Sequence, residues 1–202
     1  MTRPIRRVLV ANRGEIAVRI LRACRELGIE TVQAHSEADR DSMAVQMADR
    51  AVCIGLPPST QSYLDPVALV SAAVSQGADA IHPGYGFLSE KAAFAGLCDR
   101  HGITFIGPRA SVIPLMGDKA TARRIAAEAG VPVTPGSSDT LTDAADALRV
   151  ARGLGFPVLL KASAGGGGRG MRVVNEEREL TDAFQQASAE ALSAFEIGRA
   201  HV

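Results

Sequence analysis

The chain has 202 residues, enough for one large domain or two small ones, and its 47% hydrophobic content is that of a globular protein. Its 22 basic and 22 acidic residues cancel, so no net field would draw it to nucleic acid or to an anionic membrane. No apolar run of about 18 residues occurs, and we expect a cytoplasmic protein without a membrane span. Cys24, Cys53 and Cys98 lie far apart in apolar segments, where buried, reduced thiols are expected.

Short apolar runs alternate with helical patterns over the first 107 residues. Five strands are expected, at 7–11, 29–34, 51–54, 80–82 and 103–106. Helices are expected between them, at 14–27, 41–48, 65–77 and 89–100, with Asp65 and Ser89 as N-caps. In the first helix Ile16, Ile20, Cys24 and Leu27 share one predicted face. This alternation predicts an α/β fold with a doubly wound parallel sheet of Rossmann type.

The second half of the chain has a different pattern. A turn-rich connector leads to Asp118, which is expected to cap a helix over 119–129, and the Pro/Gly-rich stretch GVPVTPGSS follows. The remaining expected elements are a helix over 142–152, strands over 157–162 and 171–174, and a helix over 177–195. Two strands joined by a glycine-rich loop and flanked by helices predict a small α+β domain.

The glycine-rich stretch KASAGGGGRGM (161–171) joins those two strands. A flexible linker would separate domains, whereas this stretch connects expected hairpin partners. Consecutive glycines allow backbone N–H groups to point at one anion, so the pattern favours a loop that cradles phosphate. It differs from a Walker A loop, because its lysine precedes the glycines, and the dinucleotide fingerprint is missing after the first strand.

Four stretches in order resemble biotin carboxylase, the biotin-dependent branch of the ATP-grasp ligases: VANRGEIAVRILRACRELGI (10–29), HPGYGFLSE (82–90), FIGP…MGDK (105–119) and FPVLLKASAGGGGRGMRVV (156–174). The resemblance implies a Rossmann-like pre-ATP-grasp domain followed by an incomplete ATP-grasp lid domain. It also implies the reaction of ATP, bicarbonate and carrier-bound biotin to carboxybiotin, with Mg²⁺ or Mn²⁺.

The resemblance also implies site residues. Lys119 and Lys161 match the two lysines that contact ATP. Gly165, Gly166, Gly167, Gly168 and Gly170 match the loop over the phosphates, and Met171 lies where the nucleotide base is approached. Arg13, Glu15, Tyr85 and Glu90 fall in family motifs at expected carboxyl ends of strands, while His82 is as easily a structural imidazole. The metal ligands and catalytic residues of the family lie beyond this stretch, so none is expected here.

We expect the pre-ATP-grasp domain over 1–116 and the ATP-grasp part over 117–195. The last seven residues, EIGRAHV (196–202), depart from the family pattern, and we expect a non-native tail. Without the rest of the family domain, the second domain should be only marginally stable, its hairpin should present an unpaired edge, and the chain alone should lack carboxylase activity.

The family implies further partners: biotin carboxyl carrier protein, carboxyltransferase subunits and a second copy in a homodimer. An acetyl-CoA carboxylase subunit is the first expectation, while pyruvate, propionyl-CoA and methylcrotonyl-CoA carboxylases share the motifs. Another ATP-grasp ligase, resembling carbamoyl-phosphate synthetase, is disfavoured by ANRGEIA and HPGYGFLSE together. A non-catalytic nucleotide-binding module remains an alternative.

Overall fold

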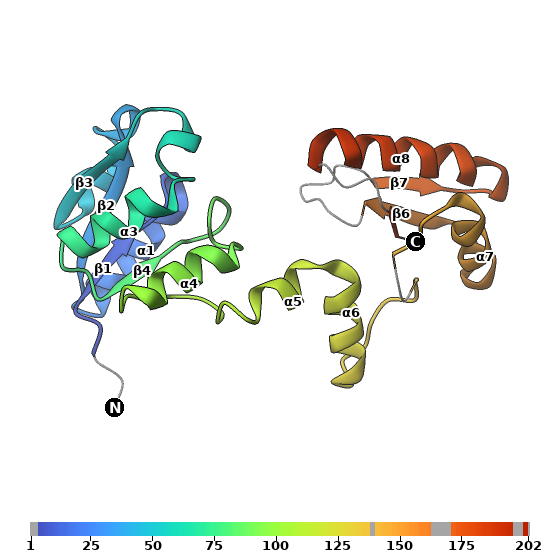
Figure 1. Ribbon diagram of the computed structural model, residues 1–202, viewed down its shortest axis with the longest axis horizontal. Coiled ribbons are helices and arrows are strands. Elements are labelled where there is room, and N and C mark those ends of the chain that lie inside the picture. Colours follow the sequence, from blue (N-terminus) through green and yellow to red (C-terminus); the bar gives the residue numbers. More distant parts are fainter. Residues whose placement is uncertain (1–3, 138–139, 163–170, 196–199, 202) are drawn as a thin grey trace. The chain divides into compact units, whose positions relative to one another are not determined.

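The computed structural model describes residues 4–137, 140–162, 171–195 and 200–201 (Figure 1). The chain forms two compact units, Met1–Pro114 and Leu115–Val202, and each is described by itself below. Among the described residues, no helix is long and apolar enough to cross a membrane.

The first unit is built on a parallel sheet in the order β3-β2-β1-β4-β5. Its strands are β1 (Arg7–Val10), β2 (Glu30–Ser36), β3 (Arg50–Gly55), β4 (Ala80–His82) and β5 (Thr104–Phe105). Its helices are α1 (Gly14–Glu26), α2 (Met43–Met47), α3 (Pro66–Ser75) and α4 (Ala92–Arg100), with 3₁₀ turns at Glu37–Asp39 and Ser59–Gln61. The expected Rossmann-type fold is confirmed.

Alternate residues of the strands face opposite layers, so both faces of the sheet are buried. Leu9 and Ile81 pack with residues of α3 and α4, while Val8 and Val10 pack with residues of α1 and α2. Burial on both sides explains why the middle strand β1 has the continuous apolar run Val8–Val10 rather than an alternating pattern.

Three local expectations for this unit are wrong. The buried face of α1 consists of Ala17, Ile20, Leu21 and Cys24, whereas Leu27 is 74% exposed, because it follows the last helical residue where the chain turns toward β2. Cys24 and Cys98 are buried free thiols, but Cys53 is exposed, because the edge strand β3 buries its neighbour Ile54 instead. Helix α4 begins at Ala92, after Ser89, because residues 84–91 form turns.

The second unit contains most of α5 (Ile113–Gly117), which spans the division between the units, and α6 (Lys119–Glu128). A three-stranded sheet follows, in the order β7-β6-β8, from β6 (Val158–Ala162), β7 (Met171–Val174) and β8 (Ala200–His201). Helices α7 (Ala144–Leu154) and α8 (Leu180–Phe195) complete it, with a 3₁₀ turn at Glu177–Glu179 before α8. Figure 1 shows α8 running alongside the β6–β7 pair.

Strand β8 corrects the expectation of an unpaired hairpin edge. Residues Ala200 and His201, expected in a non-native tail, pair antiparallel with Ala162 and Lys161 of β6. The unpaired edge expected on the hairpin is therefore occupied on the β6 side over these residues. A strand edge offers free N–H and C=O groups, and even a two-residue strand satisfies some of them.

Candidate functional site

Among the described residues, the β6–β7 pair has one face covered by helices and one face left open. Val158, Leu160 and Val174 are buried in a cluster with residues of α7 and α8. Because side chains alternate along a strand, the next residues point to the opposite face. The open face therefore carries Leu159, Lys161, Met171 and Val173, of which Met171 is 41% and Val173 65% exposed.

Lys161 and Met171 lie directly opposite each other on this open face. They form the last cross-strand pair before the glycine-rich segment, which joins their two strands. Lys161 is exposed, and within the described residues it has no ion pair. An ammonium group beside an apolar thioether is a pairing that suits a ligand with both an anionic and a flat apolar part.

Arg172 lies on the opposite, helix-facing side of the pair. It is opposite Leu160, and its Nη2 forms a 2.8 Å ion pair with Oε2 of Glu190 in α8. This basic residue, close to the glycine-rich segment in sequence, is therefore engaged in holding α8 to the sheet. Lys161 is left as the basic residue of the open face among the described positions of these two strands.

Several expected site residues fall outside the described part of the chain. Gly165, Gly166, Gly167, Gly168 and Gly170 lie in the segment 163–170, which is not among the described residues. Lys119 is the first residue of α6, directly after Asp118, whose Oδ1 accepts a 2.8 Å hydrogen bond from the backbone N of Thr121. The side chain of Lys119 also lies outside the described part.

In the first unit, polar residues gather at the carboxyl ends of β1 and β4. Asn12 is 3% exposed, and its Nδ2 donates 2.7 Å hydrogen bonds to the carbonyl oxygens of Pro83 and Tyr85. Its Oδ1 accepts from the backbone N of Arg13 at 2.8 Å. One side chain thus joins two loops that are about 70 residues apart in sequence.

Of the residues expected at this edge, the structure brings Glu15 and Tyr85 together. The hydroxyl of Tyr85 donates to Oε2 of Glu15 at 3.0 Å, and Glu15 also pairs with Arg19 at 3.4 Å. The Tyr85 hydroxyl is held protonated by the Glu15 carboxylate, which raises its pKa. Arg13 pairs with Asp39 at 3.3 Å, and Glu90 lies exposed in the turn before α4.

Asp39 and its partners were missed by the sequence reasoning. Its Oδ2 accepts hydrogen bonds from Ser36 Oγ at 2.8 Å and from the Tyr63 hydroxyl at 2.9 Å. The Tyr63 ring stacks on Phe87 with ring centroids 5.1 Å apart. The turn that follows β2 is thereby tied to the β4–α4 loop. The sequence signal that could have predicted this cluster is Asp39 three residues after Ser36, the last residue of β2.

His82 holds the turn at Gly84, which fits the structural role that the sequence allowed for it. Its Nδ1 accepts a 3.0 Å hydrogen bond from the backbone N of Gly84, which requires that nitrogen to be unprotonated. Burial lowers the pKa of the imidazole below its usual value, because a buried charge is poorly solvated.

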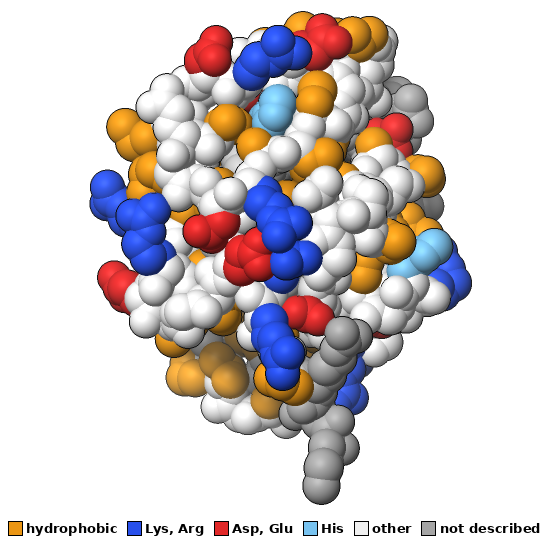
Figure 2. Space-filling model, turned by 90° about the vertical axis from the view of Figure 1, so that its left-hand side faces the viewer, with side chains coloured by type: hydrophobic (Ala, Val, Ile, Leu, Met, Phe, Trp, Pro, Cys, Tyr) orange, Lys and Arg blue, Asp and Glu red, His pale blue; other side chains and the backbone are white. Residues whose placement is uncertain are grey.

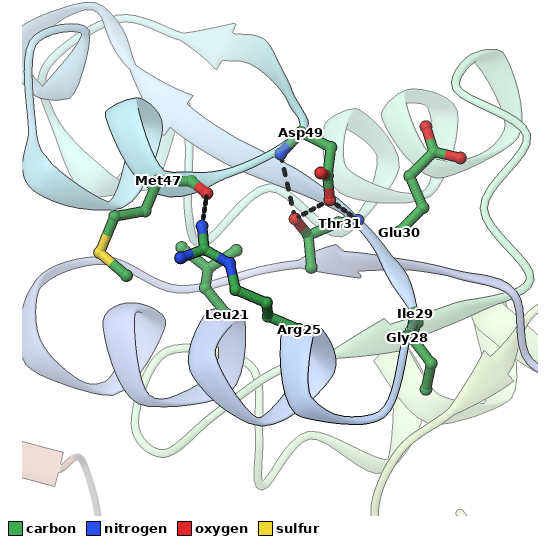
Figure 3. A pocket seen from close by; sticks show the side chains of 8 residues that line it. All are labelled: Leu21, Arg25, Gly28, Ile29, Glu30, Thr31, Met47 and Asp49. Carbon is green, nitrogen blue, oxygen red and sulfur yellow. Dashed lines mark hydrogen bonds between the residues drawn. The ribbon is translucent and has the colours of Figure 1, made fainter.

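A hollow of about 280 Å³ lies at the other end of the first unit, where β2 begins (Figure 3). Arg25 donates to the carbonyl oxygen of Met47 at 2.9 Å, and Asp49 accepts from both N and Oγ1 of Thr31 at 2.8 Å. These polar groups satisfy one another, and the hollow is distant from the carboxyl ends of the strands. It therefore contributes nothing to the candidate site.

Charges are interspersed on the face of the molecule shown in Figure 2, where basic and acidic side chains alternate with hydrophobic ones. In the described part of the chain, no group of three His, Cys, Asp or Glu residues could hold a metal ion. What the described site offers is therefore a cation, apolar contacts and backbone groups.

Two family models match the chain: the biotin carboxylase N-terminal domain over residues 4–113, and the carbamoyl-phosphate synthase L chain ATP-binding domain over residues 118–202. The biotin carboxylase of Pseudomonas aeruginosa is 56% identical over 192 residues, which is 95% of this chain and 43% of that protein. The chain thus spans less than half the length of this relative.

Solved structures of biotin carboxylases have the same fold as this chain. A biotin carboxylase–β,γ-ATP complex from Campylobacter jejuni has a TM-score of 0.92 at 47% identity, covering 98% of this chain and 44% of that one. The biotin carboxylase domain dimer of 2-oxoglutarate carboxylase from Hydrogenobacter thermophilus, with MgADP and bicarbonate, has a TM-score of 0.90 at 50% identity, covering 99% and 44%. The chain belongs to the biotin carboxylase family of ATP-grasp ligases.

Proposed function

We propose that this chain acts as the amino-terminal part of an enzyme that carboxylates biotin at the expense of ATP, with bicarbonate as the carbon source. The observation that carries the proposal is the open β6–β7 face, where the exposed Lys161 stands opposite Met171 at the start of the glycine-rich segment. This face would receive the nucleotide, and Lys119 would be a second phosphate contact.

The donor set of this face fits ATP. Lys161 would neutralise part of the negative charge of the phosphates, and the five glycines Gly165, Gly166, Gly167, Gly168 and Gly170 would allow backbone N–H groups to approach them closely. Met171 and Val173 would contact the base through apolar atoms. Phosphoryl transfer depends mainly on positioning and charge stabilisation, which these groups supply.

The divalent cation, Mg²⁺ or Mn²⁺, would be bound mainly by residues that follow this stretch in the longer relatives. In the bound state it supplies charge neutralisation between the phosphates. The part of this chain that is described would contribute the lysine and the apolar contacts. A solved relative contains MgADP and bicarbonate together, which supports a role for Mg²⁺ and bicarbonate in the reaction.

The partners are proposed from the similarity to biotin carboxylases. We expect a homodimer, since a related domain is described as a dimer, and we expect biotin carboxyl carrier protein and carboxyltransferase subunits to act with it. The first choice for the complex is acetyl-CoA carboxylase. Pyruvate, propionyl-CoA and methylcrotonyl-CoA carboxylases remain alternatives, and 2-oxoglutarate carboxylase joins them because its biotin carboxylase domain is 50% identical to this chain.

The test is bicarbonate-dependent ADP release by the full-length enzyme, measured with and without free biotin. The proposal predicts ADP release that depends on both bicarbonate and biotin, together with formation of carboxybiotin from labelled bicarbonate. Binding of ATP without any carboxybiotin would support the non-catalytic nucleotide-binding module instead.

A further inference from the structure

Two motifs of the first unit, ANRGE after β1 and HPGYG at the end of β4, have no part in nucleotide binding as proposed above. In the order β3-β2-β1-β4-β5, β2 and β3 are added on one side of β1, and β4 and β5 are then added on its other side. The strand order therefore reverses between β1 and β4. In open parallel sheets, ligands bind at the carboxyl ends of the strands where the order reverses in this manner. Asn12 and the loop Pro83–Phe87 lie at that place.

Asn12 holds this place with a combination of groups that few side chains offer. Both hydrogens of its amide are used, in the 2.7 Å bonds to the carbonyl oxygens of Pro83 and Tyr85. Its side-chain oxygen Oδ1 accepts from the backbone N of Arg13 at 2.8 Å, and the backbone carbonyl oxygen of Asn12 accepts a 2.7 Å bond from Nε2 of the buried Gln33. An aspartate has no such donors when ionised, and a serine has one, so neither can replace the amide.

The loop is shaped to fit against this amide. Gly84, Gly86 and Phe87 have φ values of 65°, 69° and 42°, a region that favours glycine. A Cβ atom at Gly84 would lie 2.9 Å from Nδ2 of Asn12 and 3.1 Å from Cγ1 of Ile16. The asparagine and the glycine therefore pack closely, and a side chain at position 84 would displace the Asn12 amide or Ile16 of α1.

The outer side of the loop is exposed and polar. The Tyr85 side chain is 61% exposed and is bonded to Glu15 of α1. Groups at this edge are therefore available to a ligand, while Asn12 beneath them is buried and cannot touch one.

We infer that Asn12 is a positioning residue for biotin carboxylation, acting through the loop Pro83–Phe87, whose exposed groups it fixes at the reversal point of the sheet. The inference rests on the proposed function and deepens it. The proposed function assigns nucleotide binding to the second unit, so loss of the Asn12 amide should affect turnover and leave ATP affinity in place.

The test compares Asn12→Ala with Thr31→Val in the full-length enzyme. Thr31 is a matched control, because it is equally buried in the same sheet, and its hydroxyl makes two hydrogen bonds with Asp49 at the opposite end (Figure 3). Both variants should lower the melting temperature. Asn12→Ala should also lower kcat for biotin carboxylation roughly 10- to 100-fold with ATP affinity within about twofold, whereas Thr31→Val should leave kcat within about twofold.

Asn12→Asp keeps the side-chain shape and covers the case in which the alanine variant fails to fold. Its ionised carboxylate would face two carbonyl oxygens, while its protonated form restores one donor. The activity of Asn12→Asp relative to wild type should therefore rise as the pH falls. His82, Glu15 and Arg13 lie nearby in both proteins, so the ratio of their activities compares two enzymes that differ in sequence only at position 12.

Two results would overturn the inference. One is an Asn12→Ala enzyme that has the same melting temperature as Thr31→Val and keeps the kcat of the wild type. The other is an Asn12→Asp activity ratio that does not change with pH. A wild-type enzyme that binds ATP but forms no carboxybiotin would overturn the proposed function, and this inference with it.

Discussion

The partly buried hydrogen bond between Tyr63 and Asp39 gives the first prediction at the scale of single residues. Burial and the Asp39 carboxylate raise the pKa of Tyr63 from 10.0 to about 12. A group whose pKa is higher in the folded than in the unfolded state stabilises the fold below its unfolded pKa, and this contribution is lost as the pH rises through the folded value.

Replacing Tyr63 by phenylalanine should therefore cost about 1 kcal/mol of unfolding free energy at neutral pH, where the hydrogen bond is intact. The advantage of the wild type should shrink between pH 10 and 12, because only the wild type has a phenol to ionise. Urea unfolding of both proteins from pH 8 to 11 measures this. If the difference in unfolding free energy between the two proteins stays constant up to pH 11, the raised pKa of Tyr63 is contradicted.

Two glycines of one loop give a second prediction. Gly84→Ala would place its Cβ 2.9 Å from Nδ2 of Asn12, which is held by two hydrogen bonds, while Gly86→Ala meets nothing within 4 Å. Both have positive φ values, so both lose about 1 kcal/mol from backbone strain. Gly84→Ala should lose a further ~1–3 kcal/mol from the clash. Equal melting temperatures for the two variants would contradict the packing described.

At the scale of elements, the helix starts marked by Asp65 and Asp118 were predicted correctly. Asp65 accepts from the backbone N of Val67 at 2.9 Å and of Ala68 at 3.0 Å, with Pro66 as the first residue of α3. Asp118 caps α6 in the same manner. Ser89 carried the same signal but no helix starts there, because the preceding positive-φ residues extend the turn and serine competes equally well for turns.

Asp65→Ala should destabilise the first unit by about 1 kcal/mol, since it leaves the two amide groups at the start of α3 without a partner. Asp65→Ser should retain most of the stability, because its hydroxyl can accept the same bonds. Thermal unfolding of the two variants is the measurement. If the serine variant is no more stable than the alanine variant, the cap does not act through these bonds.

The elements that the sequence did not predict depend on long-range contacts. The two-residue strand β8 has no pattern of its own, and it forms by pairing with β6 about 40 residues earlier in the chain. The open face of the β6–β7 pair was predictable in principle, because alternation alone places Leu159 and Val173 beside Lys161 and Met171. The bridge from Asn12 to Tyr85 was not, because it depends on the strand order.

At the scale of the whole molecule, the two compact units should unfold separately. The first has both faces of its sheet covered by helices, whereas the second covers one face of a three-stranded sheet. We therefore expect two transitions on heating this chain, the second unit melting first, because it buries less apolar surface. Calorimetry with limited proteolysis near residue 115 would check this. A single cooperative transition would mean that the units stabilise each other.

The central claim is that the open β6–β7 face binds ATP through Lys161. In the full-length enzyme, Lys161→Ala should raise the dissociation constant for ATP about tenfold or more, because a charge-assisted contact to phosphate is lost. The melting temperature without nucleotide should hardly change, since the side chain is exposed. Lys91→Ala, at an exposed lysine of the first unit, is the control and should bind ATP like the wild type. Unchanged ATP affinity in Lys161→Ala would contradict the account.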